Sequence, residues 1–350
     1  MLTGMLGIDT RAARVTWTVF LIALLIATVY AARKTIILFV IALFFAYMLS
    51  PLVESLHRYT PKRVSKTLTL TVVYLLFIGF AIAVGVQLGQ RVTEQATVLS
   101  KALPSFLAQG TSPVAQYLPS WLQPYVDRII ETLRIELRST AENALPLLRS
   151  AGGQIASIAG NVGLVVLVPI LGFFFLKDSD EMHSNLLVLV PEEGKRVVSQ
   201  VMEDLHFVIS KYIRALVLLS LATFTSYTAF FEVTGVPYSV LLAAVAAPLE
   251  FIPVIGPLTA SIIITLVSAF SGYPHVGWIV IFLLLYRVFQ DYVLSPYLMS
   301  SGVELHPLLV IFGVLAGEQI AGVMGMFLSV PVLAIARVIF MRVRESRIAS

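Results

Sequence analysis

One carboxylate lies beside a break in a long apolar run, and its position suggests chemistry. Glu250 begins the segment Glu-Phe-Ile-Pro-Val-Ile-Gly-Pro within the apolar residues 239–270. An uncompensated charge in the hydrocarbon region costs about 2.5 to 3.5 kcal/mol on insertion scales. Irregular backbone at that depth survives only where protein covers it or where it lines a wet cavity. Glu250 and the break at Pro253, Gly256 and Pro257 are therefore predicted to form a substrate-binding or ion-binding site.

The break would bring three kinds of group into one small volume. Glu250 precedes it, the interruption would free backbone carbonyls, and a second half-helix would begin near Leu258. Helix amino ends favour anions and freed carbonyls favour cations. A carboxylate that loses its water in such a place could carry a proton. The alternative interpretation is that Glu250 only caps the broken helix.

A second charged group follows in the next apolar run. Arg287 and Asp291 are four residues apart, with Gln290 beside them, so the two charges share one helix face and can pair. Charges within a membrane helix are rare, which favours a charge-compensated substrate or proton site. A structural ion pair at a helix end is the alternative.

The last apolar run adds further candidates. Glu304 and His306 immediately precede it, and the unperturbed histidine pKa of about 6.5 would permit a proton relay. The alternative for His306 is a loop hydrogen bond. Glu318 follows the pair Gly313-x-x-x-Gly317, whose glycines would permit close helix packing, and is either an intramembrane acid or an interfacial one.

Composition shows what must position these residues. The chain has 350 residues, is 58% apolar and 13% charged, and has a mean hydropathy of +0.91, whereas soluble domains are about 25% charged. We expect an all-α polytopic membrane protein with roughly 6 to 8 transmembrane helices, two of them Gly/Pro-interrupted segments that either span or re-enter. Its net charge of +4 gathers at the chain ends and in one short loop, so the partner is the lipid bilayer and not nucleic acid.

Apolar runs set the expected order of the spans. They are Val15–Ala32, Thr35–Ser50, Thr67–Leu88, Ile155–Leu176, Ala215–Phe231, Gly277–Met299 and the interrupted runs 239–270 and 307–340. Only Arg33 and Lys34 separate the first two, and one helix at about 1.5 Å per residue would far exceed a bilayer of about 30 Å, so a tight hairpin is expected. The basic residues that flank the spans place both termini in the cytoplasm.

Four regions follow from this order. Residues 1–90 would hold three transmembrane helices, and residues 91–150 an extracytoplasmic region with an amphipathic helix from Trp121 to Arg138. Residues 151–235 would hold transmembrane helices, with a cytoplasmic amphipathic helix, Glu192–Arg214, leading into one of them. Residues 236–350 would form the interrupted core, with the transport site and a basic cytoplasmic tail.

The chain lacks the residues and motifs that several function classes require. The chain has no cysteine, which excludes disulfides, cysteine metal sites and thiol nucleophiles. The His-Glu-x-x-His, Gly-x-Ser-x-Gly and Gly-x-x-x-x-Gly-Lys motifs are also absent. We therefore expect no enzyme activity, cofactor or metal. A lipid-modifying membrane enzyme built from scattered acids, and a membrane scaffold or assembly protein that uses residues 91–149, stay open as alternatives.

Four segments resemble the AI-2E family of bacterial membrane proteins, also called autoinducer-2 exporter-like or PerM-type permeases. They are Ser50-Pro51-Leu52-Val53 to Arg58; Gly235-Val236-Pro237; Glu250-Phe251-Ile252-Pro253-x-x-Gly256-Pro257; and Asp291-x-Val293-Leu294-x-Pro296, which continues into Leu305-His306-Pro307-Leu308 and a glycine-rich tail ending at Val330-Pro331-Val332-Leu333. The resemblance implies a polytopic helical transporter of the bacterial inner membrane, with homo-oligomeric assembly. It also implies export of autoinducer-2 or, alternatively, Na+(Li+)/H+ antiport.

Together, the residues and the resemblance predict a secondary transporter. It would export a small solute such as autoinducer-2, a quorum-sensing signal, with coupling to proton or cation movement because the chain lacks a nucleotide site. Glu250, Arg287 and Asp291 would lie at the site, and the breaks at Pro253, Gly256 and Pro257 would form its walls.

Overall fold

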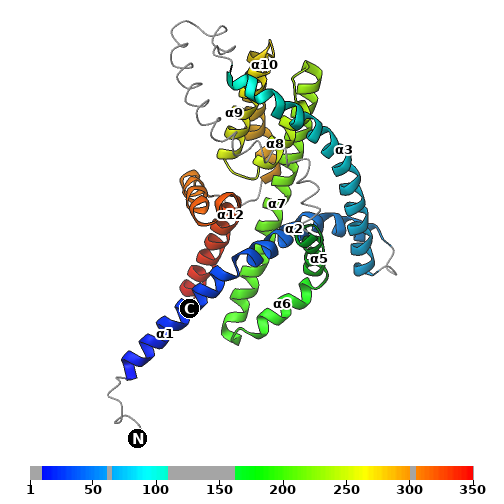
Figure 1. The fold of residues 1–350 in the computed structure, drawn as a ribbon. Helices are drawn as coiled ribbons and strands as arrows, with labels where there is room; N and C mark the ends of the chain where they lie inside the picture. Colours follow the sequence, from blue (N-terminus) through cyan, green and yellow to red (C-terminus); the bar gives the residue numbers. More distant parts are fainter. Residues whose placement is uncertain (1–9, 61–64, 109–161, 300–304, 350) are drawn as a thin grey trace.

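The computed structural model describes residues 10–60, 65–108, 162–299 and 305–349, which form helices joined by short turns (Figure 1). Over these ranges there is no strand, and 6 helices are long and apolar enough to cross a membrane. The predicted class, an all-α polytopic membrane protein, is confirmed. The predicted amphipathic helix within residues 121–138 lies outside the described ranges, as does the first part of the expected span from Ile155.

The described helices vary widely in length. In chain order they are α1 (Thr10–Ala31), α2 (Arg33–Tyr59), α3 (Lys66–Ala108), α5 (Val162–Lys177), α6 (Ser179–Val188), α7 (Glu192–Thr234), α8 (Ser239–Leu249), α9 (Ile255–Phe270), α10 (Val276–Phe289), the π-helical turn η2 (Gln290–Leu294), α11 (Ser295–Met299) and α12 (Pro307–Ala349).

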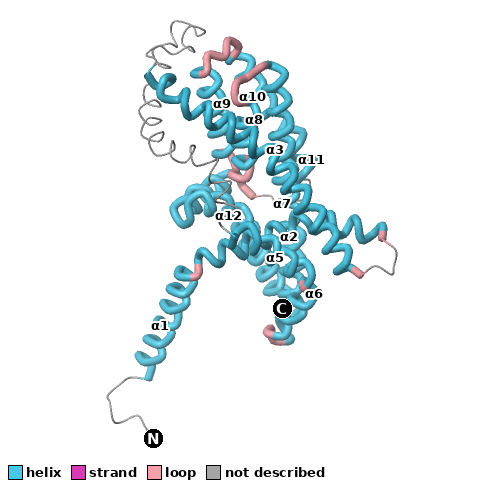
Figure 2. The backbone as a smooth tube through the Cα atoms, turned by 45° about the vertical axis from the view of Figure 1, so that its right-hand side comes forward, coloured by secondary structure: helices cyan, strands magenta, loops and turns pink. Residues whose placement is uncertain are grey.

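The first two helices do not fold back on each other, so the predicted hairpin is wrong. The N–H of Ala32 donates to the carbonyl of Thr28 at 2.9 Å, and the N–H of Ile36 donates to that of Ala32 at 2.9 Å. Helical hydrogen bonds therefore cross the junction, and α1 leads into α2 without turning back (Figure 2). Arg33 and Lys34, which were expected to turn the chain, are good helix formers, and no glycine or proline interrupts them. The prediction of a cytoplasmic N-terminus assumed that the first two helices each cross the membrane, and it stays a prediction.

Two helices are much longer than a bilayer requires. Helices α3 and α7 each have 43 residues, or about 65 Å at the helical rise, roughly twice the hydrocarbon thickness. Helix α3 continues well past the expected end at Leu88. In α7 the predicted amphipathic segment runs into the predicted span as one helix, and this continuity is confirmed. Helix α7 packs against α2, α8, α11 and α12, and is the helix around which the core is built.

The first interrupted run forms a re-entrant helical hairpin. Helices α8 and α9 pack against each other, and the hydroxyl of Tyr273, after α9, donates to the carbonyl of Thr234, before α8, at 2.9 Å. Both ends of the hairpin therefore lie at the same end of α7. Gln95 of α3 supports it by accepting a hydrogen bond from the N–H of Leu241 in the first turns of α8 at 2.8 Å. The 11 residues of α8 reach about 16 Å, or half a bilayer.

The second interrupted run is also a hairpin. Helix α12 breaks at Ala321 (φ −141°, ψ 19°) and Gly322 (φ 60°, ψ −140°). On either side of the break, Gly317 and Gly325 approach so closely that a Cβ added to Gly325 would lie 1.8 Å from the carbonyl oxygen of Gly317. One turn earlier on the first arm, Gly313 lies against Leu333 and Ser329 of the second arm. Small residues let the two backbones meet. The sequence left open whether the two interrupted runs span or re-enter, and both form hairpins.

Candidate functional site

Glu250 lies buried at the tip of the first hairpin and accepts a hydrogen bond on each carboxylate oxygen. Its exposed fraction is 7%, and that of Thr223 on α7 is 0%. The hydroxyl of Thr223 donates to Oε1 at 3.1 Å, and Nε2 of Gln290 donates to Oε2 at 2.6 Å. Thr223 also lies 3.1 Å from the hydroxyl of Tyr286 on α10. One buried carboxylate thus connects α7, the hairpin tip and the end of α10.

A tight turn holds the carboxylate in this position. Val254 has φ 65° and ψ −57°, and the N–H of Ile255 donates to the carbonyl of Pro253 at 2.7 Å. This is a γ-turn in its rare, strained form, with a β-branched residue at positive φ. Gly256 permits the turn, because a Cβ there would lie 1.8 Å from the carbonyl oxygen of Leu249. Such strain persists only where the surroundings hold it, and it is concentrated at functional sites.

The carbonyls at the break are already engaged. The carbonyl of Ala247 accepts from the N–H of Glu250 at 3.3 Å and from the hydroxyl of Ser220 at 2.7 Å. The carbonyls of Leu249 and Ile252 accept backbone N–H groups at 3.0 Å each. The prediction that the break frees carbonyls is therefore wrong for these three groups. The Glu250 carboxylate and its side-chain donors define the chemistry of the tip.

The helix that carries the second charged group presents two different faces. Tyr286 and Gln290 are four residues apart, are 6% and 3% exposed, and face Glu250. Arg287 and Asp291 occupy the next face, where Nε of Arg287 donates to Oδ2 of Asp291 at 2.8 Å with the side chains 39% and 44% exposed. The predicted pair forms, but the hydrogen bond joins Arg287 and Asp291 to each other and not to Glu250. Of the predicted residues on this helix, Gln290 is the one that hydrogen-bonds to Glu250.

Sequence reasoning missed three of the polar groups that surround Glu250: Ser220, Thr223 and Tyr286. A signal for them exists, because Ser220, Thr223 and Tyr227 recur at steps of three and four residues in an otherwise apolar helix, so they share one face. Tyr286 lies one helical turn before Gln290. Hydroxyl groups are common in apolar helices, where they can hydrogen-bond to the backbone of their own helix. The pattern on α7 therefore does not predict a site until Glu250 and the end of α10 are known to lie against it.

The remaining predicted residues lie elsewhere. His306 is exposed, and its Nδ1 accepts from the N–H of Leu308 at 3.2 Å, as a loop hydrogen-bonder at the start of α12 does. Glu318 is exposed on the first arm of α12. Glu304 lies outside the described residues. The structure therefore does not bring the described members of this group, His306 and Glu318, into hydrogen bonding with Glu250.

Aromatic rings connect the two hairpins. Phe251, next to Glu250, packs edge-on against Phe327 on the second arm of α12, with ring centroids 5.5 Å apart. Phe327 in turn packs against Phe44 of α2 at 5.1 Å. The two interrupted runs therefore meet beside the buried carboxylate.

A multi-pass helical protein with a buried carboxylate where two interrupted segments meet has the architecture of a membrane transporter. Comparison with known proteins agrees with this class. The profile described as AI-2E family transporter matches residues 19–345, and the chain belongs to that family.

Relatives cover nearly the whole chain at low identity. YrrI and YueF, candidate transport proteins of Bacillus subtilis (strain 168), are 26% and 24% identical, each over 93% of this chain and 92% of its own length. The AI-2 transport protein TqsA of Escherichia coli (strain K12) is 22% identical over 91% of this chain and 89% of its own. The chain is therefore a permease-type membrane protein, and these identities leave its solute open.

Proposed function

We propose that this protein is a secondary transporter that exports a small solute, and that Glu250 carries the coupling proton or cation. One observation carries the proposal: within the described residues, the hydrogen bonds to the buried carboxylate come from two neutral groups, Thr223 and Gln290. Neutral donors stabilise a carboxylate less than a salt bridge to a buried cation does. A proton or a small cation arriving at Glu250 would supply the missing charge compensation.

The position of Glu250 supports exchange with both sides of the membrane. It lies at the tip of a hairpin whose first arm is about half a bilayer long, so its depth is close to the midplane, where secondary transporters place coupling sites. Arg287, three residues before Gln290, is engaged by Asp291. The carboxylate is therefore free to change its charge state while the pair on the neighbouring face stays intact.

Autoinducer-2 is the first solute to test, because a relative that spans most of the chain is named as an AI-2 transport protein. We place the protein in the bacterial cytoplasmic membrane, with the arginine-rich C-terminus inside, as the positive-inside rule favours. Transport is proposed in preference to catalysis or scaffolding because the polar groups converge on a carboxylate in the apolar core.

The experiment uses proteoliposomes with an imposed pH gradient and autoinducer-2 as the solute. Wild-type protein should move the solute faster with the gradient than without it. Glu250→Gln, which keeps the shape and removes the titrating group, should make the flux independent of the gradient. Glu94→Gln, an exposed acid on α3, is the matched control and should behave as wild type.

The opposite results are equally clear. Wild-type gradient dependence in Glu250→Gln would overturn the role of Glu250. If no solute moves but a sodium gradient drives protons in the wild type and not in Glu250→Gln, the protein is a Na+/H+ antiporter that uses the same carboxylate. This last outcome would overturn export and retain the coupling site.

A further inference from the structure

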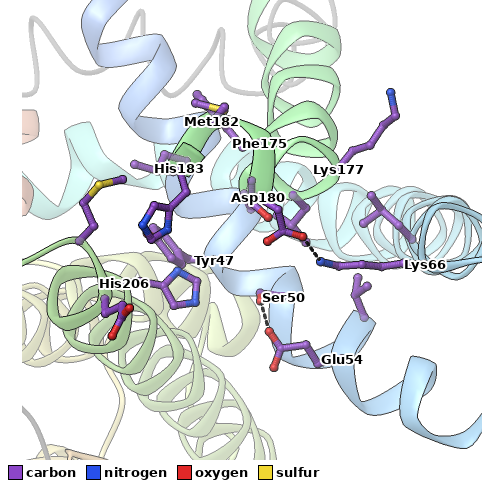
Figure 3. A pocket seen from close by; sticks show the side chains of 18 of the residues that line it. Tyr47, Ser50, Glu54, Lys66, Phe175, Lys177, Asp180, Met182, His183 and His206 are labelled. Carbon is purple, nitrogen blue, oxygen red and sulfur yellow. Dashed lines mark hydrogen bonds and ion pairs between the residues drawn. The ribbon is translucent and has the colours of Figure 1, made fainter. Parts of the chain in front are cut away.

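Residues of α2, α3, α5, α6 and α7 line a cavity of about 630 Å³ (Figure 3). The cavity lies at a different level along α7 from the partners of Glu250. His206 on its wall precedes Thr223 by 17 residues of α7, or about 25 Å along the helix. Pockets that hold small organic ligands typically measure about 300 to 1,000 Å³. Apolar and thioether side chains form much of the lining: Leu43, Leu70, Phe175, Met182, Met202 and Phe207.

The two lysines that line the cavity have acidic partners. Nζ of Lys66 lies 3.3 Å from Oδ2 of Asp180, an ion pair drawn in Figure 3. Nζ of Lys177 lies 3.5 Å from Oδ1 of Asp178. These lysines are therefore poorly placed to attract an anionic solute, because each already faces a carboxylate.

Two further carboxylates line the cavity with hydroxyl partners. Glu54 on α2 accepts from the hydroxyl of Ser50 at 2.9 Å, as Figure 3 shows, and Glu203 on α7 accepts from that of Ser199 at 3.5 Å. Neither forms an ion pair with any residue in the described ranges. They approach the cavity from two different helices, so their negative potentials add within it.

Aromatic surface lies beside these carboxylates. The ring of Tyr47 on α2 packs against the imidazole of His206 on α7, with centroids 5.2 Å apart, and both residues line the cavity. The electron-rich face of a tyrosine ring attracts organic cations. Methionine side chains adapt to ligands of varied shape, as at promiscuous binding surfaces.

We propose that this cavity binds an amphipathic organic cation, with its positive centre held by Glu54 and Glu203 and its apolar body against the aromatic and methionine lining. Lys66 and the basic loop that precedes it place this end of the protein at the cytoplasmic side by the positive-inside rule. Binding itself does not depend on how transport is coupled.

The test measures binding of radiolabelled tetraphenylphosphonium to the purified full-length protein in detergent. Exposed charge pairs are worth up to about 1 kcal/mol, or about fivefold in affinity. Glu54→Gln and Glu203→Gln should each weaken binding about two- to fivefold, and the double variant about tenfold. Glu192→Gln, an exposed acid on α7 outside the cavity lining, should bind as wild type. Triphenylphosphine oxide, a neutral molecule of similar shape, should compete at least about tenfold more weakly.

Unchanged affinity in the double variant, or equal competition by triphenylphosphine oxide, would overturn the assignment. The glutamates are exposed, so their replacement should leave folding intact, and elution of each variant as a single species checks this. Glu250→Gln should retain tetraphenylphosphonium binding. Failure of the proposed coupling would therefore appear in the flux assay alone, and failure of the cavity assignment in the binding assay alone.

Discussion

Replacing Gly325 by alanine should open the second hairpin. The added Cβ would lie 1.8 Å from the oxygen and 2.5 Å from the carbonyl carbon of Gly317. The two arms of α12 would have to separate by about 1.2 Å before the oxygen contact reaches 3.0 Å, the shortest that real Cβ atoms show. Both obstacles are backbone atoms of a helix, so a side-chain rotation cannot relieve the clash.

The expected cost follows from the kind of clash. Overpacking a well-packed interior costs about 1 to 3 kcal/mol, and the rigid obstacle places Gly325→Ala at or above the upper end. At about 2 °C per kcal/mol for a chain of this size, the apparent melting temperature should fall by about 5 °C or more. The helix propensity of alanine offsets about 1 kcal/mol of this, and it does so equally in the control below.

Gly313→Ala is the matched control. It makes the same substitution on the first arm of the same hairpin, but the new Cβ would meet the side chain of Leu333, at 2.6 Å from Cδ1. A leucine side chain can change rotamer, so this variant should lose less than about 1 kcal/mol. The melting temperature is measured in detergent from the loss of the monodisperse protein peak on heating. Equal melting temperatures for the two variants would refute the close approach of the two arms.

Three further predictions concern the first hairpin. Because the chain has no cysteine, Val233→Cys and His275→Cys can each be labelled with a membrane-impermeant maleimide, and both should react from the same side of intact cells; labelling from opposite sides would contradict re-entry. Thr223→Val should lower stability by about 1 to 3 kcal/mol in thermal melts, because it removes a hydrogen-bond donor from buried Glu250. Thr223→Ser keeps the hydroxyl and should stay within about 1 kcal/mol of wild type. An equal loss of stability in both variants would show that packing, and not the hydrogen bond, is responsible. Gln95→Leu removes the acceptor for an N–H in the first turns of α8 and should cost about 1 kcal/mol, with Gln95→Glu retaining the acceptor and most of the stability.

Charged residues and helix-breaking residues within apolar runs of the sequence located much of the candidate site. Glu250 stands out because an acid beside two prolines and a glycine is costly in an apolar run, and that cost depends on local composition alone. Gln290 was found for the same reason, as a polar residue within a span. The length and apolar character of the runs likewise determined the membrane class, since both are properties of consecutive residues.

Other features required the tertiary structure. The sequence predicted a turn at Arg33 and Lys34 from bilayer thickness, but helical hydrogen bonds cross this junction because neither residue breaks a helix. The choice between spanning and re-entrant runs also depended on distant contacts, such as the approach of Gly317 to Gly325 and the bond from Tyr273 to Thr234.

The sequence by itself determined that the protein is a helical membrane protein with a buried acid at a helix break. Only the tertiary structure decided which groups serve that acid. Tyr286 and Gln290 face Glu250, whereas Arg287 and Asp291, one position further along the same helix, pair on the next face. A one-residue step rotates a side chain by about 100° around a helix. Which face turns inward depends on packing against α7 and the hairpin, which a pattern along one helix does not contain.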